Sequence, residues 1–296
     1  MATKRAGETS RTKPASAMHK PKKVGAASAG SIPARVKAAI AELERRSSKQ
    51  VKNGMARYAI PSEHAFGVPV GVIRQIGKSL GVDHELALAL YEQKPYEARM
   101  LAVFVADPER LTPAQMDAWC RAFDNWAICD TACFHLFDRS PHAFSKVTAW
   151  AKKKPEYEKR AAFALLASLA LHHRTAADAE FERCLPLVAR EAKDPRNFVK
   201  KAVSWALRGI GGRGVALHGA ALTLAKVLAA DTEPTARWIG KDALRELEKP
   251  ALVKRLAVRD AARSPGAAHP RPSSPPKVAA GGRSLPNRAR RALREG

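Results

Sequence analysis

A regular succession of helix start and stop signals is the feature that most constrains this chain. Between residues 31 and 257, apolar residues recur at helical spacing, and capping residues, prolines or glycines bound each stretch. Thr112 and Pro113, for example, place a cap and a first-turn proline before the stretch 113–123. No segment shows the alternation of a half-buried strand. The chain is therefore predicted to be all-α.

The remaining boundaries divide the chain into helices of about one to two dozen residues joined by short turns. They are expected at Ser31–Pro33, Gly81, Asp83, Pro95, Pro141, Pro155, Asp178, Pro195 and Pro234. This organisation predicts an αα-hairpin array, an α-solenoid of HEAT-like repeats with a period of about 40 residues, although the repeats do not match closely in sequence. Such an array curves, so it should present a concave basic groove wide enough for a duplex. A compact helical bundle is the alternative architecture.

The charge of the chain favours a polyanionic partner. The formal net charge is +24, of which residues 1–30 carry +6 and residues 258–296 carry +7, leaving +11 in the middle. Both ends lack apolar periodicity, so they are predicted to be disordered basic tails around one domain of residues 31–257. The tails could raise DNA affinity or serve only for solubility. Because the predicted domain between the tails is itself basic, nucleic acid is the first candidate partner.

The cysteines and histidines do not suggest a metal site. Cys120, Cys129, Cys133 and Cys184 lie in or beside apolar helical stretches, as small buried hydrophobes of a reducing compartment would. Cys129 and Cys133 could form a two-ligand face, but no nearby His set completes a zinc site. His172 and His173 should mark a solvated helix end. No apolar run is long enough to span a membrane and no secretory signal is evident, so an intracellular protein is expected.

Three segments could carry chemistry. In the segment 123–130, Trp126 and Asp130 are four residues apart and share one helical face. A second segment, EKRAAFALL, places Arg160 at the start of an otherwise apolar helix. In the third, FVKKAVSWALR, the residues Lys201, Trp205 and Arg208 can line one side of a helix.

With these segments the chain resembles the AlkD-like DNA alkylation repair family of bacterial glycosylases. The resemblance covers about residues 50–250, and the WxxxD, KRAAFALL and FVKKAVSWALR segments occur in the family's order and at similar separations. It implies that Asp130 is the catalytic carboxylate and that Trp126 and Trp205 are the tryptophans of the groove. It also implies that Arg160 contacts DNA beside the lesion.

The resemblance implies further contacts and a partner. Tyr58 matches, by spacing, a tyrosine upstream of the FGV-P segment, while Lys201 and Arg208 are expected to hold DNA on the concave face. The implied partner is double-stranded DNA with alkylated bases, bound by a monomer in the bacterial cytoplasm. Neither a metal nor a redox cofactor is required for the implied reaction.

The implied chemistry has a physical basis. A purine alkylated at N3 or N7 is cationic and leaves readily, while positive charge develops on the deoxyribose. A fixed carboxylate stabilises that charge and can orient water, and tryptophan rings offer it attractive π faces.

Each of these roles has a structural alternative. Asp130 could form a salt bridge within the array, Arg160 could pair with Glu156, and the groove tryptophans could be packing residues, as Trp119, Trp150 and Trp238 are expected to be. For the whole chain, the alternatives are a noncatalytic protein that binds bent or damaged DNA and a helical scaffold for protein or RNA.

Overall fold

The computed structural model describes residues 30–263, and this part of the chain consists of helices without a strand. The predicted all-α class is confirmed. The first half comprises α1 (Ile32–Arg45), α2 (Lys49–Met55), the 3-10 helix η1 (Ala56–Tyr58), α3 (Val70–Leu80), α4 (His84–Tyr91), α5 (Tyr96–Val105), α6 (Pro113–Arg121) and α7 (Trp126–His135). The second half comprises η2 (Phe137–Arg139), α8 (Ala143–Trp150), α9 (Glu156–His172), α10 (Asp178–Glu182), α11 (Leu185–Glu191), α12 (Asn197–Gly211), α13 (Val215–Ala229), α14 (Pro234–Leu247) and α15 (Pro250–Arg263).

The described residues cover the whole of the expected domain, residues 31–257. Residues 1–29 and 264–296, which hold nearly all of the two expected tails, lie outside the described residues. At the C-terminal side, α15 continues to Arg263, beyond the expected boundary at residue 257. Leu256 is buried, and no proline or glycine interrupts the chain between Pro250 and Arg263. The helix therefore continues past residue 257, because a buried side chain holds it against its neighbours and no helix-breaking residue ends it there.

Several helix ends form by the local chemistry that the sequence predicts. The Thr112 hydroxyl accepts a hydrogen bond from the Gln115 N–H at 3.2 Å, and the Gln115 side chain accepts one from the Thr112 N–H at 2.8 Å, which completes a capping box. Asp83 caps α4 by accepting a bond from the Leu86 N–H. Gly81 ends α3 with φ +76°, a conformation that glycine adopts without steric cost.

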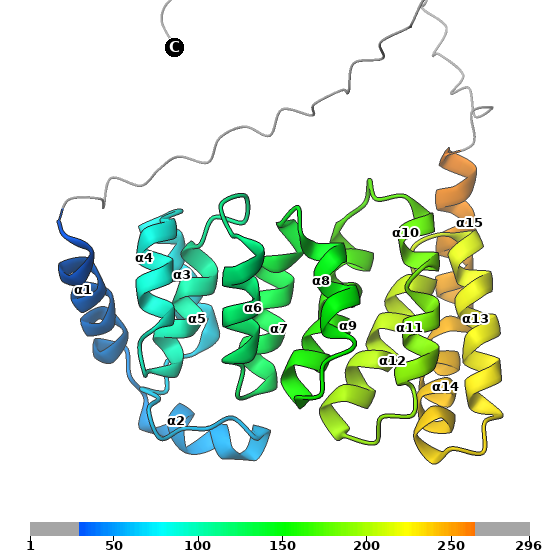
Figure 1. Ribbon diagram of the computed structural model, residues 1–296, viewed down its shortest axis with the longest axis horizontal. Helices are drawn as coiled ribbons and strands as arrows, with labels where there is room; N and C mark the ends of the chain where they lie inside the picture. The colour runs from blue at the N-terminus through cyan, green and yellow to red at the C-terminus, as the bar shows by residue number, and fades with distance from the viewer. Residues whose placement is uncertain (1–29, 264–296) are drawn as a thin grey trace, which may run out of the picture.

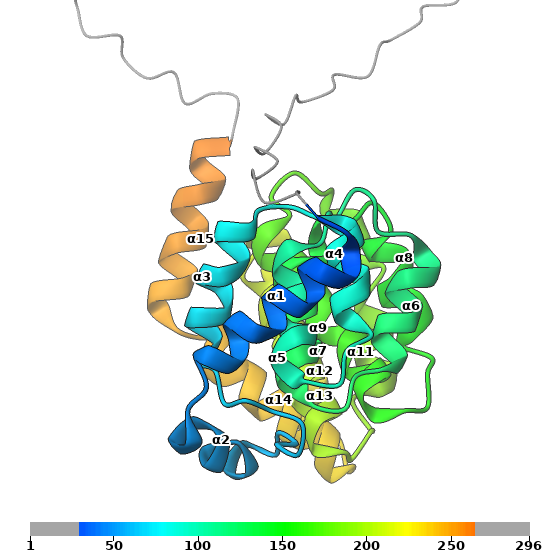
Figure 2. The ribbon, with the colours of Figure 1, turned by 90° about the vertical axis from the view of Figure 1, so that its left-hand side faces the viewer.

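The helices form two layers. Helices α3, α5, α7, α9, α12 and α14 pack each against the next and form an inner row, while α4, α8 and α13 cover α5, α9 and the α12–α14 pair. Figure 1 shows these pairs following one another along the long axis of the molecule. Figure 2 looks along that axis: α3 and α15 lie on the left of the view, whereas α7, α9 and α12 lie nearer its centre, so the inner row is concave toward the left. The solenoid prediction is confirmed, and the compact bundle is wrong.

Helix α9 is the centre of this arrangement. It is buried without interruption from Arg160 to Ala170 and packs against α7, α8 and α12. A helix that is apolar on all sides is expected only where other elements surround it. The four cysteines are buried, as predicted, and so are Trp119 and Trp150. Trp238 differs, because it is 37% exposed and the Lys200 ammonium lies 4.9 Å from its ring centre.

Residues 30–263 contain neither a cluster of metal-binding side chains nor a membrane-spanning helix. No cluster of three or more His, Cys, Asp or Glu side chains in this part of the chain could hold a metal ion. In the same range, no helix is both long and apolar enough to cross a membrane.

Candidate functional site

Helix α7 presents a stripe of three large or charged residues on the inner row. Asn125 is fully buried and caps the helix, its side-chain oxygen accepting bonds from the N–H groups of Ala127 and Ile128 at 3.0 and 3.1 Å. This cap sets where the helix begins and therefore where Trp126 and Asp130 point. Trp126, Asp130 and Phe134 follow at intervals of four residues and are all half-buried. Trp126 and Asp130 thus share one face, as predicted.

Asp130 forms a two-pronged ion pair with Arg160 of α9. Arg160 Nε lies 2.9 Å from Asp130 Oδ1, and Arg160 Nη2 lies 2.6 Å from Asp130 Oδ2. The remaining terminal nitrogen of Arg160 donates to the carbonyl oxygen of Phe198 at 2.7 Å. Three neighbouring inner helices therefore meet at one guanidinium group. The alternative pairing of Arg160 with Glu156 is wrong, since Glu156 instead accepts a bond from the Phe198 N–H.

Burial and charge act in opposite directions on this pair. The Asp130 side chain is 16% exposed and the Arg160 side chain 7%. Burial raises the pKa of Asp130 above its ordinary value, and the Arg160 guanidinium opposes that rise. Burial also disfavours the charge on Arg160, yet the Asp130 carboxylate raises the pKa of Arg160 above its ordinary value. Because arginine stays protonated in proteins, its charge favours the ionised form of Asp130.

Aromatic rings continue the site from Asp130 toward α12. The Phe134 ring stacks on Trp205 with ring centres 4.6 Å apart and an angle of 13° between the planes. Trp205 is therefore joined to the α7 stripe through Phe134. Sequence reasoning did not select Phe134, although its position four residues after Asp130 placed it on the same helical face.

Tyr58 lies beside Trp126 and contacts it through the Tyr58 main-chain carbonyl group. Trp126 Nε1 donates to the Tyr58 carbonyl oxygen at 2.7 Å, while the Tyr58 residue itself is 60% exposed. Any residue at position 58 could accept this bond. The exposed phenol is thus available to another molecule.

The segment that follows Tyr58 is anchored by Glu97, a fully buried residue of α5. The Glu97 carboxylate accepts three main-chain bonds, from the N–H groups of Phe66 (3.0 Å), Gly67 (2.7 Å) and Val68 (3.1 Å). Gly67 has φ +82°, and a Cβ there would lie 2.2 Å from the Ser48 carbonyl oxygen. Only glycine fits this close approach. The sequence analysis did not select Glu97.

The two expected DNA-holding residues of α12 differ in their surroundings. Lys201 is exposed and, within residues 30–263, forms no ion pair; it lies one turn before Trp205. Arg208 lies 3.6 Å from the Asp242 carboxylate and its Nε donates to the Ser204 carbonyl oxygen at 3.4 Å. Arg208 lines a cavity together with Trp205, whereas Lys201 does not. The structure thus brings Trp205 and Arg208 together and leaves Lys201 apart from them.

His172 lies at the exposed C-terminal end of α9, as expected, and it also has protein partners. His172 Nδ1 lies 2.6 Å from Asp138 Oδ2, and the Ser168 hydroxyl donates to the same oxygen at 2.6 Å. The Asp138 side chain is only 1% exposed, so a buried carboxylate holds a half-exposed imidazole. The His172 ring also lies nearly perpendicular to the Phe134 ring, with ring centres 5.7 Å apart. His172 therefore belongs to the surroundings of the aromatic stack.

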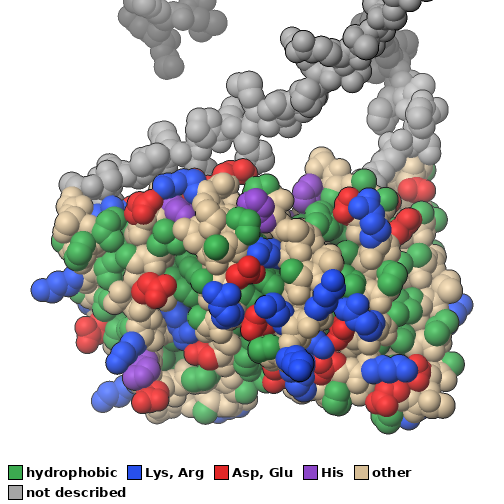
Figure 3. Space-filling view, in the orientation of Figure 1, with side chains coloured by type: hydrophobic (Ala, Val, Ile, Leu, Met, Phe, Trp, Pro, Cys, Tyr) green, Lys and Arg blue, Asp and Glu red, His purple; other side chains and the backbone are tan. Residues whose placement is uncertain are grey.

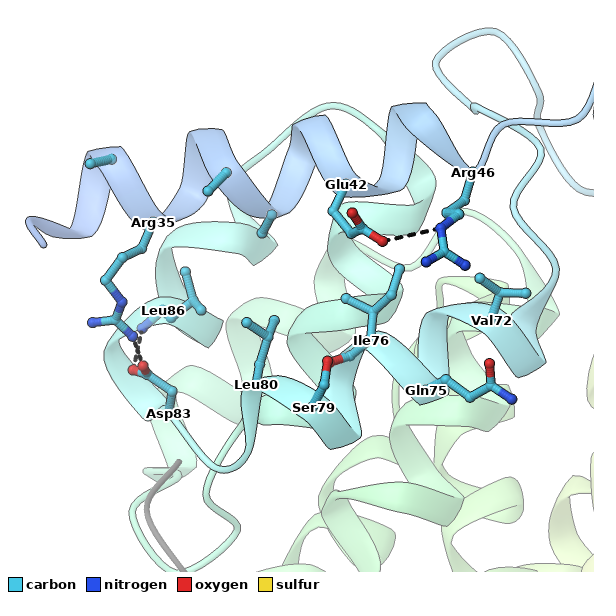
Figure 4. A pocket seen from close by; sticks show the side chains of 13 residues that line it. Arg35, Glu42, Arg46, Val72, Gln75, Ile76, Ser79, Leu80, Asp83 and Leu86 are labelled. Carbon is cyan, nitrogen blue, oxygen red and sulfur yellow. Dashed lines mark hydrogen bonds and ion pairs between the residues drawn. The ribbon is translucent and has the colours of Figure 1, made fainter. Parts of the chain in front are cut away.

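The other large cavity has a different character. About 510 Å³ in volume, it lies between α1 and the α3–α4 pair (Figure 4). Its charged side chains pair with one another, Arg35 with Asp83 and Arg46 with Glu42. On the face of the molecule seen in Figure 3, Lys and Arg side chains are likewise interspersed with Asp and Glu. No aromatic residue is among those that line this cavity.

Comparison with known proteins identifies the family of the chain and supports its fold. Residues 39–263 match the family of the DNA alkylation repair enzyme. The fold is similar to a solved structure described as a new family of proteins related to the HEAT-like repeat DNA glycosylases with affinity for branched DNA structures, with 21% identity, a TM-score of 0.60, and coverage of 72% of this chain and 95% of that one. AlkD2 from Streptococcus mutans is also similar, with 17% identity, a TM-score of 0.48, and coverage of 73% and 98%. Among curated proteins, none matches the sequence significantly. Because the family match spans most of the chain, this protein belongs to the DNA alkylation repair enzyme family.

Proposed function

We propose that the chain is a monofunctional DNA glycosylase that hydrolyses the N-glycosidic bond of cationic N3- or N7-alkylated purines in duplex DNA. The observation that supports this most is the Asp130 carboxylate, which Arg160 holds at 2.6 and 2.9 Å on the inner row of helices. Family membership supports the coarser part of the proposal, which is action in the repair of alkylated DNA.

In the proposed reaction, the carboxylate stabilises charge and orients water. The alkylated base leaves with the electron pair of the glycosidic bond and becomes neutral, while positive charge develops on the deoxyribose. Asp130 places a negative charge that needs no reorganisation, because Arg160 fixes both of its oxygens. A carboxylate has about four lone-pair sites, so each oxygen can still accept a bond from the attacking water.

The aromatic residues would form the walls of the sugar site. Trp126 lies one turn before Asp130, and the Phe134–Trp205 stack begins one turn after it. A ring face near the developing cation contributes roughly 0.5–2 kcal/mol. The Tyr58 carbonyl holds the Trp126 ring in place from outside the helix.

Hydrolysis without strand cleavage is the expected outcome. Lyase chemistry needs an amine nucleophile beside the sugar, and no lysine is part of the Asp130–Arg160 pair or of its aromatic walls. The product should therefore be an intact strand with an abasic site.

A second candidate function is binding of damaged or branched DNA without catalysis. Both oxygens of Asp130 already have a partner, as a purely structural ion pair would require. The similar structure at 21% identity is described by its affinity for branched DNA. In this case the groove would bind DNA, and base release would not follow.

The test is a single-turnover reaction of the wild-type protein on duplex DNA with one 7-methylguanine. Free base should appear in solution, and strand breaks should appear only after treatment with hot alkali. Strand breaks without alkali would contradict the monofunctional assignment. Tight binding without base release, on this substrate and on a 3-methyladenine duplex, would favour the noncatalytic function.

A further inference from the structure

The two tryptophans of the candidate site are held in different ways. Trp126 Nε1 donates to the Tyr58 carbonyl oxygen at 2.7 Å, so a directional hydrogen bond fixes its ring. The indole N–H of Trp205 has no hydrogen-bond partner among residues 30–263, and the residue is only partly buried. Its ring stacks instead on Phe134, with ring centres 4.6 Å apart. The orientation of Trp205 therefore depends on where the Phe134 ring lies.

The Phe134 ring is in turn confined by His172. The two ring planes make an angle of 84°, and the ring centres are 5.7 Å apart. An edge-to-face pair of this kind is a favoured aromatic geometry. Phe134 of α7 thus contacts the imidazole of α9 as well as the indole of α12. A displacement of the imidazole would reach Trp205 through Phe134.

A buried carboxylate holds the imidazole. His172 Nδ1 lies 2.6 Å from Asp138 Oδ2, and the Ser168 hydroxyl donates to the same oxygen at 2.6 Å. The Asp138 side chain is 1% exposed, whereas the His172 side chain is 46% exposed. Because an ionised carboxylate only accepts hydrogen bonds, Nδ1 of His172 is the donor. This bond fixes the orientation of a ring that solvent would otherwise leave free to rotate.

The surroundings of Asp138 are not those that stability alone would favour. Its second oxygen, Oδ1, is buried and accepts no hydrogen bond within the described part of the chain. A buried carboxylate oxygen without a partner lowers the stability of a protein. Natural proteins place such unsatisfied groups preferentially at functional sites. The contact between Asp138 and His172 therefore calls for a role beyond the fold.

We propose that His172 is a positioning residue for the Trp205 wall of the candidate site. Asp138 and Ser168 hold the imidazole, and the imidazole confines Phe134. Phe134 then keeps the Trp205 ring turned toward the place where the deoxyribose would lie. His172 acts through these residues and does not touch the reacting atoms. The inference rests on the proposed glycosylase function, because only then does the direction of the Trp205 ring affect a rate.

Asparagine at position 172 separates the ring from the hydrogen bond. The amide nitrogen of asparagine can take the place of imidazole Nδ1 and donate to Asp138, while the part of the ring that contacts Phe134 is lost. His172→Asn should therefore unfold at nearly the urea concentration of the wild type. His173→Asn is the matched control, because His173 is exposed and its ring lies beside Phe144 instead.

The test is a double-mutant cycle in single-turnover excision of 7-methylguanine at saturating protein. His172→Asn should slow excision within the roughly 2- to 30-fold range expected for Trp205→Ala. In the Trp205→Ala background the same substitution should have no further effect, because the ring that it positions is absent. Equal fold losses in both backgrounds would overturn the proposal. So would an unchanged rate in His172→Asn, or an equal loss in His173→Asn.

A spectroscopic readout keeps the test independent of catalysis. In protein labelled with ¹⁵N-tryptophan, the indole N–H cross-peak that is missing from Trp205→Phe belongs to Trp205. His172→Asn should shift this cross-peak, because the Phe134 ring beside it moves, and should leave those of Trp126 and Trp238 in place. A Trp205 cross-peak at its wild-type position would overturn the proposal. A wild type that releases no base contradicts only the glycosylase proposal, and the cross-peak still decides whether His172 positions the stack.

Discussion

Replacing Arg160 by glutamine should destabilise the protein in a pH-dependent way. The substitution leaves the Asp130 carboxylate, 16% exposed, without its cation. Breaking one side of a buried pair costs about 3–5 kcal/mol, and an amide that donates one hydrogen bond recovers about 1 kcal/mol. We therefore expect the free energy of unfolding to fall by about 2–4 kcal/mol at neutral pH.

The dependence on pH follows from the pKa of Asp130. Burial raises this pKa, and Arg160 opposes the rise, so the pKa should be higher still in the variant. A folded-state pKa above the unfolded value means that the folded state binds the proton more tightly. The resulting stability is present at low pH and is lost as the pH rises through the folded-state pKa. The free energy of unfolding of the variant should consequently fall further below that of the wild type as the pH rises from about 5 to about 7.5. The further loss is about 1.4 kcal/mol for each unit, within this pH range, by which the folded-state pKa of Asp130 is higher in the variant than in the wild type.

Urea unfolding of wild type and variant at both pH values measures this effect. Arg208→Gln is the control, because Arg208 is one-third exposed and lies 3.6 Å from its carboxylate partner. Its effect should stay below about 1 kcal/mol and should not change with pH. A deficit in Arg160→Gln that is equal at both pH values, or below about 1 kcal/mol at both, would refute the reasoning.

Three other substitutions test separate parts of the account. Glu97→Gln should lower the free energy of unfolding by about 2–4 kcal/mol in urea, because an amide cannot accept all three main-chain bonds; a neutral effect would contradict the anchoring role. Arg196 and Lys159 lower the pKa of Asp194 to about 2, so this carboxylate stabilises the fold above the unfolded pKa of about 4. Asp194→Asn should cost roughly 1–2 kcal/mol at neutral pH, and this cost should vanish as the pH falls from about 4 to about 2; a constant cost across that range would be inconsistent with the ion pairs. Trp205→Ala should slow single-turnover excision roughly 2- to 30-fold, and an unchanged rate would remove the ring from the sugar site.

The sequence was sufficient to predict the helices and the face of α7. Caps and breakers such as Thr112, Gly81 and Asp83 act within a few residues, so they can be recognised without knowing the fold. The shared face of Trp126 and Asp130 likewise depends only on helical periodicity. Their roles in DNA repair came from the family resemblance and remain proposals.

The contacts between helices could not be predicted in the same way. Asp130 meets Arg160, and Asp138 meets Ser168, each across 30 residues. This register depends on the length of α8 and of the turns around it, and no repeat matches another closely enough to reveal it. Arg160 was therefore expected to hold DNA, whereas its closest partner is the Asp130 carboxylate. For the same reason, the contact of His172 with a buried carboxylate could not be predicted.

The most direct test of the central proposal is single-turnover excision of 7-methylguanine by wild type and Asp130→Asn. Asparagine keeps the size of the side chain and removes its negative charge, and Asp242→Asn on α14 is the matched control. We expect Asp130→Asn to slow excision by about 100- to 1000-fold or more while DNA affinity stays within about tenfold, and we expect the control to react at the wild-type rate. Equal excision rates in wild type and Asp130→Asn would contradict the assignment of Asp130 as the catalytic carboxylate.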